Sequence, residues 1–158
     1  MTNAGKASVV LGLGLFILWW LRRPTATVTT SETLELKPSD YPEGVKDTAR
    51  AIARAEGFYV PDSIPQRAHN PGNLKLGGQT LGNTGITVFD NDDAGWAALY
   101  RQLALIVSGS SAIYTLDTTI RAMGQKWTAT ANEQLAWSTN VASALGVDVD
   151  APLSQVLL

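Results

Sequence analysis

The sequence ARAIARAEGF at residues 49–58 predicts the last turns of an amphipathic helix. At helical spacing, Ile52 and Ala53 lie on its apolar face, and the next position on that face is Glu56. Gly57 is typical of the left-handed residue that ends a helix, which places Glu56 in the last turn. Desolvation and the negative end of the helix dipole both raise the pKa of a carboxyl group in that position. Glu56 therefore has the features of a general acid that stays protonated near neutral pH.

A structural role for Glu56 competes with the catalytic one. A glutamate at the end of a helix is commonly solvated, or it pairs with an arginine elsewhere in the fold. On this helix, Arg50 and Arg54 fall on the other face, so neither neutralises Glu56 from within the helix. Burying a carboxyl group that has no use would cost on the order of 1 to 3 kcal/mol, which favours the catalytic interpretation.

Length and composition fit one folded domain without a disulfide or metal framework. The chain has 158 residues, of which 16% are charged, and it contains no cysteine and one histidine. We therefore expect no disulfide, no thiolate or histidine-built metal site, and no cofactor. The 9 basic and 14 acidic residues beyond residue 23 leave a net charge of −5, which argues against a nucleic-acid partner.

Residues 7–21 form an uncharged apolar run that predicts a single N-terminal transmembrane helix. The run is shorter than the roughly 20 residues of a typical span, but Trp19 and Trp20 beside two arginines suit a membrane interface. A cleavable signal peptide and a buried core helix are the alternatives; against cleavage, two arginines and a proline stand where small residues would be expected. We expect a membrane anchor at 1–23, a linker at 24–37 and a folded domain at 38–158.

The folded domain is expected to be α+β, mainly helical with a small antiparallel β wing. Asp40 and Glu43 have the spacing of a capping box, which predicts a first helix over about 41–56. Glycine-rich turns then separate three short strand-like segments within residues 74–89. The remaining segments predict a helix that begins at Asn91 or Asp92, a shorter helix through Leu116 to Trp127, a helix from Thr130 to Gly146, and a last turn at 152–157.

Several segments of this domain together resemble the lysozyme-like lytic transglycosylases. The most specific part is Glu56-Gly57-Phe58 followed by Asn70-Pro71-Gly72-Asn73-Leu74. The resemblance covers about residues 43–157. Within the family, the chain most resembles the small peptidoglycan-degrading proteins carried by phage particles, including tailless phages with an internal membrane. Trp137 departs from the family by standing where a tyrosine is common, and Trp127-Thr128-Ala129 replaces a proline-containing turn. Further matching segments are residues 86–89 leading into 94–99, and 145–147 with 152–153.

The resemblance implies both a fold and an activity. It implies a lysozyme-like domain in which Glu56 is the catalytic acid of a membrane-anchored peptidoglycan lytic transglycosylase. In that family the glutamate protonates the oxygen of the MurNAc–GlcNAc bond, and the substrate's acetamido group can stabilise the cationic centre. The glutamate then deprotonates the C6 hydroxyl to give a 1,6-anhydro product. The implied partners are peptidoglycan glycan strands, a lipid membrane through residues 7–21 and virion proteins, with the domain facing the periplasm when a phage enters or leaves its host.

A muramidase-type hydrolase is the second enzymatic interpretation. Hydrolases of glycosidic bonds commonly use two carboxyl groups, about 5 Å apart when retaining and about 6.5 to 9.5 Å apart when inverting. The other candidate acids fall in predicted loops or at a helix N-terminus, where solvation or capping explains them, so one glutamate fits a lytic transglycosylase better. These acids are Asp62, Asp90, Asp92 and Asp93.

Five further side chains are candidates for substrate binding. Asn70 and Asn73 offer amide contacts to a glycan, although stabilisation of their own turn explains them equally well. His69 is next to them and either contacts substrate or faces solvent. Trp127 lies on an apolar stripe, so core packing competes with sugar stacking. Asn132, at the start of the last long helix, is the fifth candidate.

A role without catalysis is the alternative from a different functional class. A lysozyme-like domain that has lost its activity would serve as a structural or glycan-binding component of a virion or envelope. The fold alone does not separate these uses, because one scaffold hosts either. The position of Glu56 on an otherwise apolar face favours the enzyme.

Overall fold

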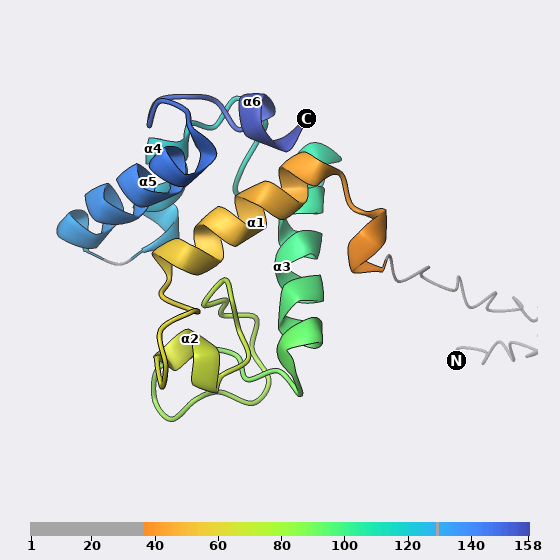
Figure 1. Ribbon diagram of the computed structural model, residues 1–158, viewed down its shortest axis with the longest axis vertical. Coiled ribbons are helices and arrows are strands. Elements are labelled where there is room, and N and C mark those ends of the chain that lie inside the picture. The colour runs from red at the N-terminus through yellow and green to blue at the C-terminus, as the bar shows by residue number, and fades with distance from the viewer. Residues whose placement is uncertain (1–36, 129) are drawn as a thin grey trace, which may run out of the picture. The chain divides into compact units, whose positions relative to one another are not determined.

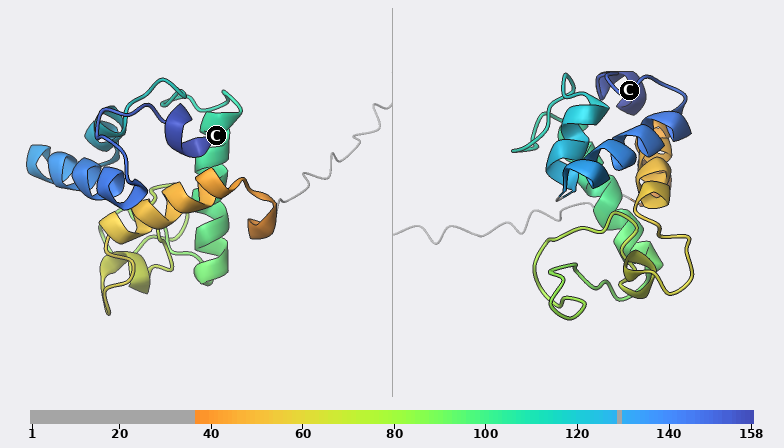
Figure 2. Two further views of the ribbon diagram at one scale, coloured as in Figure 1. Left: turned by 45° about the horizontal axis from the view of Figure 1, so that its top comes forward. Right: turned by 90° about the vertical axis from the view of Figure 1, so that its left-hand side faces the viewer.

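The computed structural model describes residues 37–158 except Ala129, and the structural statements below refer to these residues. They form a mainly helical domain in which α1 runs through the middle and contacts α3, α5 and α6 (Figure 1). α4 and α5 lie side by side, and α5 also packs along α1 (Figure 2). The elements are η2, a 3-10 helix (Pro38–Asp40), and the α-helices α1 (Glu43–Ala55), α2 (Ile64–Arg67), α3 (Asp92–Val107), α4 (Ile120–Trp127), α5 (Ala131–Leu145) and α6 (Ser154–Leu157).

The core forms around the apolar face of α1. Val45, Ala49 and Ile52 are all 0% exposed, as the helical spacing predicts. Burying one large aliphatic side chain such as Ile52 contributes about 1.5–3 kcal/mol, so this face fixes α1 at the centre. The other fully buried large side chains of the core come from α3, α4, α5 and the C-terminal segment: Leu99, Leu103, Ile106, Ile120, Met123, Val141, Leu153 and Leu157.

The sequence-based prediction is wrong for the start of α1 and correct for its end. The predicted capping box is wrong, because Asp40 accepts a hydrogen bond from the Lys37 backbone N–H at 2.9 Å and Glu43 instead pairs with lysine and arginine side chains of α1. The predicted stop is confirmed, since Gly57 has a φ of 78°. The Phe58 N–H closes that end by donating to the α1 backbone at 2.9 Å. Glu56 is thereby fixed as the cap of the helix.

The later helices confirm the signals that predicted them. The Asn91 side chain accepts from the backbone at 2.9 Å and caps α3. Thr130 and Glu133 form the predicted capping box of α5, which ends at Gly146 with a φ of 68°. α4 is shorter than expected because Thr119 caps its start.

The predicted antiparallel wing is wrong, and with it the α+β class. Within residues 74–89 the structure has no strand, only an isolated antiparallel bridge between Thr80 and Thr87. Scattered backbone hydrogen bonds join these segments, and side chains add to them: Asn70 binds the N–H and C=O of Leu74, and the Thr87 hydroxyl accepts from a further N–H at 2.8 Å. Left-handed glycines also interrupt the extended backbone; they are Gly77, Gly78, Gly82 and Gly85.

The prediction of a transmembrane helix finds no counterpart among the helices of residues 37–158. None of them is long and apolar enough to cross a bilayer, and the longest, α3, has 16 residues. The predicted membrane helix at 7–21 and most of the predicted linker at 24–37 lie outside the described residues.

Candidate active site

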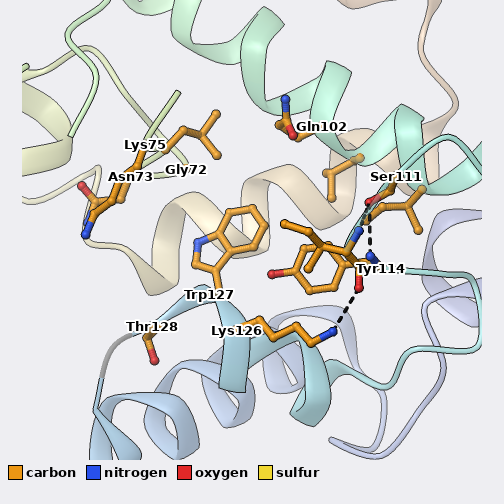
Figure 3. Close-up of a pocket in the computed structure, with 13 residues that line it drawn as sticks. Gly72, Asn73, Lys75, Gln102, Ser111, Tyr114, Lys126, Trp127 and Thr128 are labelled. Atoms are coloured by element: carbon orange, nitrogen blue, oxygen red, sulfur yellow. Dashed lines mark hydrogen bonds between the residues drawn. The ribbon is translucent and has the colours of Figure 1, made fainter. Parts of the chain in front are cut away.

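A groove opens where the end of α1 meets α4, α5 and the loop after α2. It consists of two adjoining hollows with volumes of about 380 Å³ and 360 Å³, here called the first and second lobes. Both lobes are lined by Asn73, Lys75, Trp127 and Thr128, which form the boundary between them. The first lobe extends to Gln102, Ser111, Tyr114 and Lys126 (Figure 3), and the second is lined by Glu56, Glu133, Trp137 and Asn140.

Glu56 is half-buried in the second lobe and held by an indole. Its Oε1 accepts a hydrogen bond from Nε1 of Trp137, a residue of α5 that is 4% exposed, at 2.8 Å. The Asn73 amide and the Trp127 indole face the same carboxyl group. Three neutral N–H donors therefore surround Glu56.

Burial raises the pKa of Glu56 above its ordinary value of 4.5. The hydrogen bond from Trp137 opposes this rise most, followed by the nearby N–H groups of Asn73 and Trp127, because each favours the ionised form, and the charge of Glu133 adds to the rise. Burial is the largest of these effects. Burial thus favours the protonated form of Glu56, and the N–H groups stabilise the carboxylate that forms when the proton is lost.

Trp127 lies inside a stack of three aromatic rings. Its centroid is 5.6 Å from that of Trp137 at an interplanar angle of 25°, and 6.3 Å from that of Tyr114 at 29°. Trp127 thus packs against two aromatic rings and also lines both lobes. The packing role weighed for Trp127 is therefore observed, and its role in stacking a sugar stays a prediction.

Asn73 lies at the boundary of the lobes in an unusual conformation. Its φ is 52°, in the left-handed region that asparagine adopts more readily than most residues with a side chain. Its Oδ1 is buried and has no hydrogen-bond partner among the described residues. A buried acceptor without a donor costs about 1–3 kcal/mol, so this atom marks a place that a bound ligand or water would stabilise.

The other predicted binding residues lie outside the groove. Asn70 is 0% exposed, and its amide donates to the carbonyls of Leu74 and Thr87, both at 2.9 Å. The Nδ1 of His69 lies 2.6 Å from an oxygen of Asp92 at the start of α3. Asn132 is exposed on the first turn of α5, and it lines neither lobe. Of the predicted site residues, the structure brings together Glu56, Asn73 and Trp127.

Several groove residues were not predicted as part of a site. Trp137 stands out in the sequence by its apolar spacing and by its position where the family commonly has tyrosine, and neither feature predicts a bond to Glu56. Glu133 was expected as a helix cap, which it is, since its Oε2 accepts from the Thr130 hydroxyl at 2.8 Å. Tyr114 and Lys75 carried no signal in the sequence. None of the aspartates weighed as a second acid lines either lobe.

No protein-family model matches the chain, and comparisons with curated proteins and with solved structures give no match.

Proposed function

We propose that this protein is a peptidoglycan lytic transglycosylase that cleaves the MurNAc–GlcNAc bond, with Glu56 as general acid and then as base. The observation that carries the proposal is the half-buried carboxyl group of Glu56, which faces three neutral N–H donors in a groove. A raised pKa keeps such a group protonated at higher pH than an ordinary glutamate, which general acid catalysis requires. The sequence resemblance supports the same assignment.

Bond cleavage starts with a proton on Oε2 of Glu56. The indole N–H of Trp137 donates to Oε1, and the carbonyl oxygen of a carboxylic acid accepts better than its hydroxyl oxygen, so this bond favours a proton on Oε2. Oε2 gives its proton to the glycosidic oxygen as the bond from that oxygen to C1 breaks. The carbonyl oxygen of the substrate's own acetamido group stabilises the positive charge that develops at C1.

The second step returns the proton to Glu56. The carboxylate, stabilised by the surrounding N–H groups, takes the proton of the C6 hydroxyl while O6 bonds to C1. The product is a 1,6-anhydro sugar, and no water is consumed. Neutral donors suit this cycle, because a lysine or arginine beside Glu56 would lower its pKa and disfavour the protonated starting state.

One carboxyl group is sufficient for this reaction, and residues 37–158, as far as they are described, offer no second one in an equivalent position. Glu133 lines the same lobe, but its side chain is exposed and bonded to Thr130 at the start of α5. A solvated helix cap suits an electrostatic neighbour of Glu56 better than a nucleophile. We also propose the biological role that the resemblance implies, which is local opening of peptidoglycan as a phage enters or leaves its host.

The test is release of soluble fragments from purified peptidoglycan by the full chain. We expect activity from the wild type and a loss of about 10²-fold or more in Glu56→Gln. Glu43→Gln is the matched control, since it makes the same change at an exposed site on the same helix, and it should keep full activity. An equally large loss in Glu133→Gln would point to a two-carboxylate hydrolase. A folded Glu56→Gln variant with wild-type activity would refute the proposal.

A further inference from the structure

The two lobes of the groove differ in charge. Among the described residues, the first lobe is lined by two lysines, Lys75 and Lys126, and by no acidic side chain, whereas the second is lined by Glu56 and Glu133 and shares Lys75 at the boundary. Residues 37–158 as a whole carry 9 basic and 12 acidic side chains. A lobe with two positive charges in an acidic domain favours a ligand that carries negative charge at that end of the groove.

Contacts with neighbouring groups hold the ammonium group of Lys126 in place. Its Nζ donates to the carbonyl of Ile113 at 3.1 Å and lies 5.8 Å from the ring centroid of Tyr114 (Figure 3). An ammonium group has three N–H donors, so two remain for an acceptor in the lobe. Lys75 stands at the boundary of the lobes. Neither lysine pairs with an acidic side chain in the part of the chain that the structure describes.

We propose that the first lobe is an anion-recognition site in which Lys75 and Lys126 bind a carboxylate carried by the glycan. This inference rests on the proposed function. In peptidoglycan, the acidic group next to the sugar ring belongs to the 3-O-lactyl substituent of MurNAc, or to the peptide attached to it, whereas GlcNAc is neutral. Ammonium groups bind carboxylates as point charges and need no strict bidentate geometry, which suits a substituent on a flexible ether arm.

Binding to the full-length Glu56→Gln variant tests the proposal, because the ligand is then not consumed. Three oligosaccharides of equal length serve as probes: peptidoglycan glycan with free lactyl carboxylates, the same glycan with its peptides, and neutral GlcNAc oligomers. We expect calorimetry to show tighter binding of the acidic probes than of the neutral one. The tighter binder of the first two probes identifies which carboxylate the lobe prefers. Affinity for the acidic probes should also fall with added salt.

Lysine variants in the same background locate the site. Lys75→Met and Lys126→Met should each lower the affinity for the acidic probes by about two- to fivefold, which is the range measured for exposed charge pairs. The affinity for the neutral probe should stay unchanged. The matched control is Lys37→Met with Lys46→Met, which removes two charges from lysines that line neither lobe and should leave both affinities unchanged. Lys126 donates to the backbone of the loop at Ile113, whereas Lys75 makes no hydrogen bond to that loop. An affinity loss in Lys75→Met therefore reports the lost charge rather than a change in the loop.

Equal affinity for acidic and neutral probes, in a protein whose wild type cleaves peptidoglycan, would overturn the anion site and leave the proposed function standing. The opposite outcome would likewise distinguish the anion site from the proposed catalytic function. Lysine-dependent binding of acidic glycan by a wild type that releases no product would support the anion site and contradict catalysis. A loss of acidic-probe affinity as large in the Lys37 and Lys46 control would also overturn the site, since it would show that overall charge is responsible.

Discussion

The indole Nε1 of Trp137 lies 2.8 Å from Oε1 of Glu56, across 81 residues of sequence. This hydrogen bond joins α5 to the end of α1 and fixes one oxygen of the carboxyl group. Because an indole N–H only donates and a carbonyl oxygen is the better acceptor of the acid, the bond favours a proton on the other oxygen, Oε2. Trp137 is in this sense a positioning residue, and its contribution can be measured separately from that of the stack it belongs to.

Trp137→Phe should shift the pH dependence of activity upward. The substitution keeps an aromatic ring beside Trp127 but removes a donor that lowers the pKa of Glu56. Activity requires protonated Glu56, so the alkaline limb of the kcat profile should move to higher pH, while kcat at the optimum falls about tenfold from lost orientation. A purely structural role would lower activity without moving the limb. Trp96→Phe, outside the groove, should leave the profile unchanged.

Glu56→Gln should become more stable than the wild type as the pH rises. The pKa of Glu56 is higher in the folded protein than its ordinary value of 4.5, so the folded state binds the proton more tightly. Its contribution to stability is present below pH 4.5 and is lost as the pH rises through the raised pKa. Urea unfolding from pH 4 to 8 should show the difference in unfolding free energy growing in favour of glutamine across that window. A difference that is constant with pH, or of opposite slope, would contradict the raised pKa.

Asn70→Ala should destabilise the fold, whereas Asn132→Ala should not. Asn70 is fully buried, and its amide makes three hydrogen bonds to backbone groups of the loop that carries Asn73. Leaving those groups unpaired should cost about 3 kcal/mol or more. The exposed Asn132 should change stability by less than about 0.5 kcal/mol. Equal effects of the two substitutions on the urea midpoint would show that Asn70 does not hold the loop.

Gly95→Ala should lower stability, against the usual trend in helices. A Cβ at Gly95 would lie 1.8 Å from the carbonyl oxygen of His69, so α3 or the loop would have to move. We expect a loss of about 1–3 kcal/mol, whereas alanine normally improves a helix by about 1 kcal/mol over glycine. Ala97→Gly on the same helix should show the ordinary propensity loss. An increase in melting temperature for Gly95→Ala would contradict the close approach of α3 to His69.

The sequence predicted the helices well because their ends depend on local chemistry. Gly57 and Gly146 adopt the left-handed conformation that glycine allows, and Asn91 and Thr130 cap the helices that follow them. The wing was mispredicted because a buried side chain decided it. The Asn70 amide binds backbone groups of Leu74 and Thr87 and so holds the loop without a strand, and nothing in the local alternation of residues shows this.

The site was predictable only in part. The position of Glu56 follows from the period of α1 and the glycine that ends it. The partners of Glu56 follow from tertiary structure, since Trp137 reaches it from α5 and Trp127 from the end of α4. Both tryptophans satisfy the pattern of a core residue, and they are largely core residues whose polar edge faces the groove. The spacing of apolar residues predicts that an indole is buried, but it does not predict which acceptor the indole N–H binds.

The mass of the fragments released from peptidoglycan by the full-length wild type tests the central claim most directly. If Glu56 acts alone as acid and then base, the fragments end in 1,6-anhydro-MurNAc, lighter by one water than the hydrolysis product, and Glu56→Gln releases none. Fragments with free reducing ends from the wild type would show that water attacks C1 and would contradict the single-carboxyl mechanism.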